Sequence, residues 1–407
     1  MKTLFILGRQ AEISLAELES LHGADAIERH SSHVALVDIH PEVSLLARLG
    51  GTTKIARYFS STPSDHWEDV EKYLLMTLPL QLEQLNPGKI KLGFSVHGMH
   101  DVSSKMLQQT TLRIKKQLVK NGKSIRIVPN KAPTLSTAQV LHNKLTGPMG
   151  FELIISKDGE GVVHFGQTIA SQDIDAYANR DQARPKRDAK VGMLPPKLAQ
   201  IIVNMAVNSA DLSKPTTVLD PFCGTGVVLQ EANLMGFVIA GSDIDPRMVA
   251  YSDQNLMWLA DQPISKVFRS DASKDDPDWR YFTLKEADAL THNWEPNPDF
   301  IACETYLGRP FSSAPKPNVL QEVMKDVDYI HQKFLKNVAS QTAPGFRMCL
   351  AVPAWNIQGT FRHLKVLDSL EKLGYNRVSF AYARDEALIY HREGQIVGRE
   401  LVTLIRK

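Results

Sequence analysis

Cysteine is scarce in this sequence: among 407 residues only Cys223, Cys303 and Cys349 occur, far apart and without a CxxC pair. Such spacing predicts neither a disulfide framework nor a cysteine zinc site, and is typical of a reduced, cytoplasmic chain. No run of about 18 apolar residues is present, so we expect no membrane span. The apolar run before Arg9 is too short for the hydrophobic region of a signal peptide. The thirteen histidines form no HExxH motif, and we predict no metal site.

Acidic residues are missing between Val102 and Phe151, although the net charge of the chain is only +2. This window holds nine lysines and arginines, which favours contact with a nucleic acid over the alternative of a solvated helix face. A second basic stretch follows at 180–190. Its lysines and arginines could contact phosphate or could instead pair with Asp181 and Asp188. The expected RNA-binding residues are Arg113, Lys116, Lys120, Lys123, Arg126, Lys131, Lys144 and Arg184.

The pattern of strands and helices divides the chain into four segments. Residues 1–64 and 65–167 each alternate short strands with amphipathic stretches, as small α+β domains do. Residues 168–190 are polar, charge-dense and poor in aliphatics, which predicts a linker. Over 191–407 strands and helices alternate at longer spacing, which predicts βαβ units and a mostly parallel sheet with helices on both faces. The C-terminal hairpin is expected to add antiparallel strands at one edge.

The stretch "TTVLDPFCGTGVVLQ" predicts a buried strand ending at Asp220, a glycine loop and a helix. Gly224 and Gly226 allow a sharp turn and close approach of a ligand, and free amides at the helix start favour an anionic group. An ordinary tight turn is the alternative. Leu229 replaces the third glycine of a dinucleotide fingerprint, and no Gly-Lys-Ser/Thr of a P-loop follows.

Acidic residues stand at the ends of the next two predicted strands. Asp243 ends "FVIAGSD", where a ribose diol would be held, and Asp288 follows "TLKEA", where an adenine amino group could bind. Asp271 is the rival of Asp288 for that role. Acids at three successive strand ends predict a nucleoside-containing cofactor.

These motifs resemble those of a known family. "DPFCGTG" with "GSDID" is similar to the S-adenosylmethionine loop of methyltransferases that modify exocyclic amines. "RDQARPKRDAKVGMLPPKLAQ", "LSTAQVLHNKLTG" and "HFGQTIASQDIDAYANRD" resemble segments of the THUMP-domain tRNA guanine-N2 methyltransferases of archaea and eukaryotes. The resemblance implies a ferredoxin-like domain at 1–64, a THUMP RNA-binding domain at 65–167 and a Rossmann-like methyltransferase domain at 191–407. It implies a cofactor site of Asp220, Pro221, Cys223, Gly224, Thr225, Gly226, Asp243 and Asp288.

The catalytic stretch of the family departs from its usual form here. Amino methyltransferases end the fourth strand with Asp or Asn, two prolines and an aromatic residue; this chain has "ETYLG". The resemblance implies that Glu304 and the carbonyl of Thr305 accept the two N–H bonds of an exocyclic amine while Tyr306 stacks on the flipped base. Without the two prolines, the φ angles of this loop are no longer fixed. A turn with a solvated glutamate is the alternative.

The expected function is therefore methyl transfer from S-adenosylmethionine to the N2 amine of a guanosine in tRNA. A tRNA-binding protein of the same fold without catalysis and an N6-adenine methyltransferase are the alternatives. We expect a monomer, and the need for a small activator subunit stays open.

Overall fold

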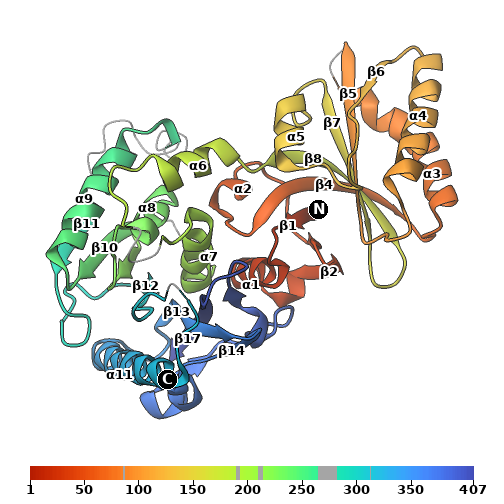
Figure 1. Ribbon diagram of the computed structural model, residues 1–407. Helices are drawn as coiled ribbons and strands as arrows, with labels where there is room; N and C mark the ends of the chain where they lie inside the picture. Colours follow the sequence, from red (N-terminus) through yellow and green to blue (C-terminus); the bar gives the residue numbers. More distant parts are fainter. Residues whose placement is uncertain (86–87, 189–192, 210–213, 265–281, 312) are drawn as a thin grey trace. The chain divides into compact units, whose positions relative to one another are not determined.

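The computed structural model describes the chain except for residues 86–87, 189–192, 210–213, 265–281 and 312 (Figure 1). Two compact units are present, one made of residues 1–18 and 22–174 and the other of residues 175–407 with 19–21. None of the helices in the described ranges has the length and apolarity needed to cross a bilayer.

The first unit is built on one mixed sheet of eight strands in the order β2-β3-β1-β4-β8-β7-β5-β6 (Figure 1). β5 runs parallel to β6 and β7, and the other pairs are antiparallel. The strands are β1 (Thr3–Leu7), β2 (Ile27–Ser31), β3 (Val34–Val37), β4 (Thr52–Thr62), β5 (Lys89–His97), β6 (Ser124–Ile127), β7 (Gly150–Lys157) and β8 (Val163–Ser171).

Two helices cover one face of the β5–β7 part of this sheet. Apolar residues recur every three or four positions along α3 (Trp67–Gln81) and α4 (Ser104–Lys120), and they pack against buried side chains of β5, β7 and β8. The Ser103 hydroxyl caps α4 by accepting the amide of Met106. The remaining helices of the unit are α1 (Ala11–His22), α2 (Leu45–Arg48) and α5 (Thr137–Asn143).

A buried ion pair ties the middle strands of the sheet together. The Lys54 ammonium on β4 lies 2.5 Å from the Glu152 carboxylate on β7, and it also donates to the carbonyl of Leu135. The hydroxyls of Ser95 and Thr168 donate to the same carboxylate at 2.6 and 2.7 Å. Because several partners satisfy both charges, the pair is tolerated inside the sheet.

The segment predicted as a linker at 168–190 is partly regular structure, so that prediction was wrong. Residues 168–171 continue β8, and Ile174–Gln182 form the helix α6. The polar composition concealed one buried stripe: Tyr177 and Arg180 both face the interior. The predicted boundary at 64/65 falls between β4 and α3, within one continuous sheet, and the two domains proposed there stay a prediction.

The second unit contains the mostly parallel sheet predicted for 191–407. Its main strands follow the order β11-β10-β9-β12-β13-β17-β15, and only β17 runs antiparallel to its neighbours. β16 and β17 form the predicted hairpin, but β15 closes the sheet, so β17 is not an edge strand. The strands are β9 (Thr217–Asp220), β10 (Val238–Asp243), β11 (Phe282–Glu286), β12 (Phe300–Glu304), β13 (Arg347–Ile357), β14 (Thr360–Arg362), β15 (Tyr375–Arg377), β16 (Ile389–Tyr390) and β17 (Val397–Arg406).

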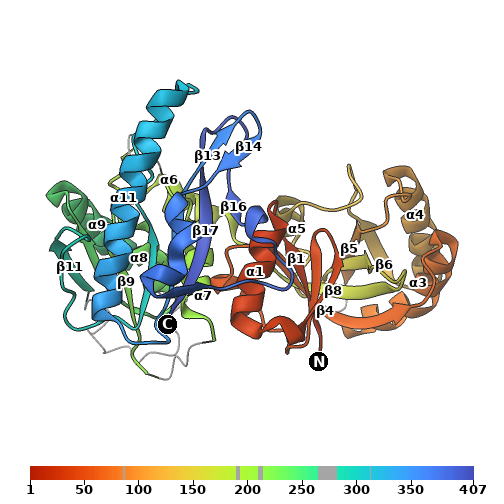
Figure 2. The ribbon, with the colours of Figure 1, turned by 90° about the horizontal axis from the view of Figure 1, so that it is seen from below.

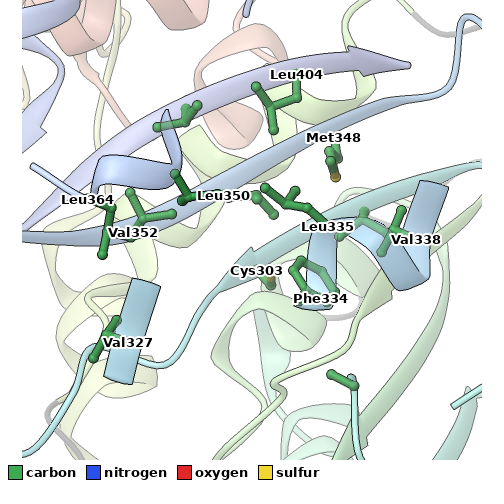
Figure 3. Close-up of a cluster of buried hydrophobic side chains, with 14 of the residues drawn as sticks. Cys303, Val327, Phe334, Leu335, Val338, Met348, Leu350, Val352, Leu364 and Leu404 are labelled. Atoms are coloured by element: carbon green, nitrogen blue, oxygen red, sulfur yellow. The ribbon is translucent and has the colours of Figure 1, made fainter. Parts of the chain in front are cut away.

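Helices cover both faces of this sheet (Figure 2). α7 (Pro196–Val207), α8 (Val227–Leu234) and α9 (Pro246–Ala260) pack on one face. α11 (Pro317–Gln341) covers the other face, where Phe334, Leu335 and Val338 meet Cys303 and Met348 (Figure 3). The stretch after β14 forms 3-10 turns at Lys365–Leu373.

Candidate active site

The strand order places two predicted carboxylates at a topological switch point. The chain leaves β9 towards β10 on one side and leaves β12 towards β13 on the other, so the carboxyl ends of β9 and β12 border a crevice. Asp220 is the last residue of β9 and Glu304 is the last residue of β12. This is the edge of an α/β sheet at which ligands bind.

Three carboxyl groups lie near one another at this edge. Asp220 is 2% exposed, and its Oδ1 accepts the amide of Phe222 at 3.0 Å. Burial raises the pKa of Asp220 well above its ordinary value, and the charges of Asp243 and Glu304 raise it further. Burial likewise raises the pKa of Asp243. Such coupled acidic groups are typical of functional sites.

The glycine loop is held by internal hydrogen bonds. The Gly224 amide donates to Asp243 Oδ2 at 2.9 Å, and the Gly226 amide donates to the carbonyl of Cys223. Asp243 Oδ1 accepts the amide of Asp245 at 3.0 Å. The amides of Gly224 and Gly226 are thus occupied within the loop, and the free amides expected at the start of α8 stay a prediction.

The two glycines are required for different reasons. Gly226 has φ +79°, and a Cβ there would lie 2.9–3.1 Å from Ser252 of α9, so close packing of helix against loop excludes a side chain. Gly224 has φ +50°, and a Cβ would meet only the carbonyl oxygen of Phe222, at 3.9 Å. The loop is thus open to a ligand at Gly224 and closed by α9 at Gly226.

Two polar residues of α9 hold the glycine loop through hydrogen bonds, and neither was predicted from the sequence. The Ser252 hydroxyl donates to the Gly224 carbonyl at 2.8 Å, and the Asn255 side-chain amide donates to the Thr225 carbonyl at 2.8 Å. Asn255 also exchanges two hydrogen bonds with the backbone of Lys186. Two polar residues spaced three apart on the apolar face of an amphipathic helix could have indicated this role.

The other predicted cofactor residues surround this loop. Pro221 and Cys223 are buried, and burial raises the pKa of the Cys223 thiol, which disfavours a nucleophilic thiolate. Asp288 lies two residues beyond β11, where the Ala287 amide donates to the Asp243 carbonyl and Asp288 Oδ1 accepts the amide of Leu290. The rival, Asp271, lies outside the described residues.

Glu304 has an unpredicted partner. The Nε of Arg399, on β17, donates to Glu304 Oε1, and both side chains are largely buried. Burial raises the pKa of Glu304, while Arg399 acts in the opposite direction. No hydrogen bond from a described residue reaches Oε2. The alternative of a solvated turn glutamate is wrong, and one carboxylate oxygen stays available to a substrate.

Hydrogen bonds hold the loop after Glu304 in place of the two prolines. The Thr305 amide donates to the Ala351 carbonyl at 3.1 Å, and the Thr305 hydroxyl lies 2.7 Å from His331 Nε2. His331 Nδ1 lies 2.7 Å from the Val327 carbonyl, so Nδ1 carries the proton and Nε2 accepts from the hydroxyl. Burial lowers the pKa of His331 to about 4, which keeps the ring neutral at pH 7. The expectation that the loop is free was wrong at Thr305.

Tyr306 projects from this loop. Its side chain is 45% exposed, unlike its neighbours Glu304 and Thr305. Gly308 follows with φ +86° and fits against Val323 and Val327 of α11. An exposed ring next to a buried carboxylate is suited to stacking on a planar base.

The basic residues predicted to bind RNA fall into two groups. Lys116, Lys120, Arg126, Lys131 and Lys144 are exposed, and Lys123 is half-buried. Arg113 instead forms a two-pronged ion pair with Glu71, with Nε–Oε1 at 2.5 Å and Nη2–Oε2 at 2.7 Å. A phosphate would have to compete with Glu71 for Arg113, whose predicted role in RNA binding stays a prediction.

The burial of Arg184 also differs from what was predicted. It is 3% exposed and lies beneath the surface, near the buried pair of Arg180 and Glu231. Arg180 donates to both oxygens of Glu231, which is on α8. Direct contact of Arg184 with an RNA phosphate therefore does not fit its burial. The alternation of charges in the sequence suggested a surface stretch, whereas Arg180 on α6 and Arg184 just after this helix are both buried.

Comparison with known protein families agrees with this geometry. Residues 184–260 match the family model described as "RMKL-like, methyltransferase domain". This segment contains the glycine loop, Asp243 and the two α9 residues that brace the loop. Over these residues the chain is similar to an RMKL-like methyltransferase domain. The Rossmann-like fold predicted for 191–407 is confirmed by the strand order of the second unit, and the match over 184–260 agrees with the predicted methyltransferase resemblance.

Curated relatives match part of this chain. A tRNA (guanine(10)-N2)-dimethyltransferase from Methanothermobacter thermautotrophicus is 32% identical over 176 residues, 42% of this chain and 43% of the relative. One of the same name from Methanocaldococcus jannaschii is 37% identical over 117 residues, 28% of this chain and 32% of the relative. The chain thus spans less than half the length of the curated relatives it matches.

A solved structure shares the fold of this chain. TrmN from Thermus thermophilus aligns over 100% of both chains with a TM-score of 0.50 and 16% identity. At this identity the likeness shows the fold alone.

Proposed function

We propose that the chain is an S-adenosylmethionine-dependent methyltransferase acting on the N2 amine of a guanosine in tRNA. The observation that carries the proposal is the convergence of Asp220, Asp243 and Glu304 at the switch point of the sheet. The names of the two curated relatives support guanosine N2 and tRNA as substrate. The methyltransferase domain match supports the reaction type.

The donor groups around the glycine loop fit a nucleoside. Each oxygen of Asp243 accepts one backbone amide, which leaves a lone pair on each for the two hydroxyls of a ribose. The open side of Gly224 leaves room for the ligand, and Asp288 stands at the next strand end for the adenine. When bound there, S-adenosylmethionine supplies an electrophilic methyl group. Pro221, Cys223, Thr225 and Gly226 shape the loop.

Glu304 and Thr305 orient the guanine amine. Its lone pair is delocalised into the ring, so the amine is a weak nucleophile until both N–H bonds are accepted. Glu304 Oε2 accepts one and the Thr305 carbonyl accepts the other, which localises the lone pair towards the methyl group. Arg399 opposes the rise that burial causes in the pKa of Glu304, and it fixes the other carboxylate oxygen. Tyr306 stacks on the base.

The exposed lysines and arginines of the first unit bind the tRNA backbone. Lys116, Lys120, Arg126, Lys131 and Lys144 carry this role, and Lys123 contributes from the edge of the set. We assign residues 1–64 and 65–167 as the ferredoxin-like and THUMP parts of this RNA-binding unit. Affinity for tRNA then falls steeply as salt rises. In this proposal the enzyme acts in the cytoplasm as a monomer, with or without a small activator subunit.

The test is methyl transfer to unmodified bulk tRNA with labelled S-adenosylmethionine, followed by nucleoside analysis. Label in N2-methylguanosine supports the proposal, and label in N6-methyladenosine would assign the other amine. A protein without catalysis, the one alternative that the departure at "ETYLG" favours, would give no label while binding both cofactor and tRNA.

Glu304→Ala is the matched variant for that assay. It should abolish turnover and leave the affinity for S-adenosylmethionine and tRNA within about twofold, since Glu304 acts on the amine in the transition state. Glu322→Ala, a change at the exposed surface of α11, serves as the control.

A further inference from the structure

Two histidines and an aspartate of the first unit come together far from the methyltransferase domain in sequence. His30 is on β2, His164 is on β8, and Asp158 lies in the turn between β7 and β8. One ligand atom from each residue lies within 4.8 Å of the other two. The imidazole centroids of the histidines are 4.0 Å apart. Nothing in the proposed methyl transfer uses these side chains.

His30 is the unusual member of the cluster. It is 5% exposed, and neither ring nitrogen has a hydrogen-bond partner among the described residues. Glu28 Oε2 is the nearest carboxylate oxygen recorded, 3.8 Å from His30 Nε2, which is beyond hydrogen-bond distance. A buried imidazole without partners loses the hydrogen bonds that water would give it. A ligand that uses a ring lone pair would remove that cost.

The other two residues are already fixed. Asp158 Oδ1 accepts the amides of Glu160 and Val162, each at 2.9 Å, so the turn holds the carboxylate. Asp158 Oδ2 lies 2.8 Å from His164 Nε2, and His164 Nδ1 has no partner among the described residues. When the proton of Nε2 moves to Nδ1, the His164 ring stays neutral and Nε2 offers a lone pair beside the carboxylate.

We propose that His30, His164 and Asp158 bind one divalent first-row transition cation of the Zn²⁺ class. Two imidazole nitrogens and a carboxylate oxygen are a ligand set that such ions take, with a fourth position for water or Glu28. Ligand atoms of a tetrahedral zinc site lie roughly 3.3 Å apart, given bonds of about 2.0–2.1 Å. The Asp158–His164 spacing is near this value, and the His30 ring must turn towards them.

The experiment uses the full chain after treatment with a chelator. Zn²⁺ is titrated by calorimetry, and Co²⁺ replaces it as a spectroscopic probe. We expect one ion per chain, visible d–d bands of a site with nitrogen and oxygen ligands, and no thiolate charge-transfer band. At about a hundredfold excess over Kd the melting temperature of the unit that holds the site should rise by roughly 5–10 °C.

The variants separate a metal site from simple packing. His30→Phe keeps a stacked ring and Asp158→Asn keeps the acceptor for the turn amides, yet each removes a ligand. Each should weaken binding by more than the roughly 10–100-fold that loss of an outer partner costs. His142→Ala, at an exposed position of α5, is the matched control and should bind as the unchanged chain does.

Three outcomes would overturn the proposal. They are no stoichiometric Zn²⁺ binding by the unchanged chain, equal binding by His30→Phe and Asp158→Asn, and a thiolate band that places the ion on a cysteine. Because metal binding is measured without methyl transfer, none of these results depends on the proposed enzymatic activity.

Discussion

Replacing Arg399 by methionine would remove the cation that pairs with Glu304 while keeping most of the side-chain volume. Glu304 would then be a largely buried carboxylate without its ion-pair partner. Breaking a buried pair in this way costs roughly 3–5 kcal/mol, because the remaining charge keeps its desolvation penalty. We therefore expect the second unit to lose stability by about this amount at pH 8.

The pH dependence has a defined sign. Burial already raises the pKa of Glu304, and without Arg399 nothing among its causes opposes that rise. A carboxyl whose folded pKa is raised stabilises the fold below its unfolded pKa and loses that contribution as pH rises through the folded pKa. The deficit of Arg399→Met should therefore shrink as the pH is lowered from 8 and Glu304 takes up a proton.

The assay is urea unfolding followed by tryptophan fluorescence in a Trp67→Phe background. The four other tryptophans all follow residue 250, so their signal reports the second unit by itself. Glu304→Gln and the double variant complete a cycle, with an expected coupling of about 0.5–3 kcal/mol. A coupling near zero, or a deficit that does not change with pH, would refute the reasoning.

Three further changes test other parts of the structure. Gly226→Ala should destabilise the second unit by about 1–3 kcal/mol more than Gly236→Ala in urea unfolding, because both glycines have positive φ but only Gly226 faces a close neighbour; equal losses would contradict the packing argument. Lys54→Met should destabilise the first unit by roughly 3–5 kcal/mol by leaving Glu152 unpaired, and calorimetry showing no loss would count against it. Thr305→Val removes the hydroxyl bound to a buried histidine; we expect a cost of about 1–3 kcal/mol and a lower kcat, and unchanged values would disprove a positioning role.

The sequence predicted the carboxylates at the strand ends because that signal is local. A short apolar run that ends in an acid, as at Asp220, Asp243 and Glu304, marks the end of a buried strand wherever the sheet places it. The mostly parallel sheet also followed from the alternation of helix and strand, whereas the order of its strands did not. Local patterns were therefore enough to locate the candidate site.

Partners distant in sequence could not be predicted in the same way. Arg399 is 95 residues from Glu304, and its single charge on a strand looks like any edge residue. His30 is far from Asp158 and His164, so no motif spacing could reveal the cluster, and the prediction of no metal site rested on motifs alone. Contact with phosphate was expected at 180–190 because composition does not tell which side chains of a polar stretch are buried, as Arg180 and Arg184 are.

The length of β4 has a consequence for how the first unit can be divided. β4 pairs with β1 along one side and with β8, up to Thr62, along the other. A chain cut at 64/65 would leave a piece whose last strand has a bare edge and a second piece whose β8 lacks its neighbour. Each edge is a template for strand addition. The two fragments should aggregate alone and rescue each other when co-expressed, so that recombination between genes would preserve the unit only by moving both halves together.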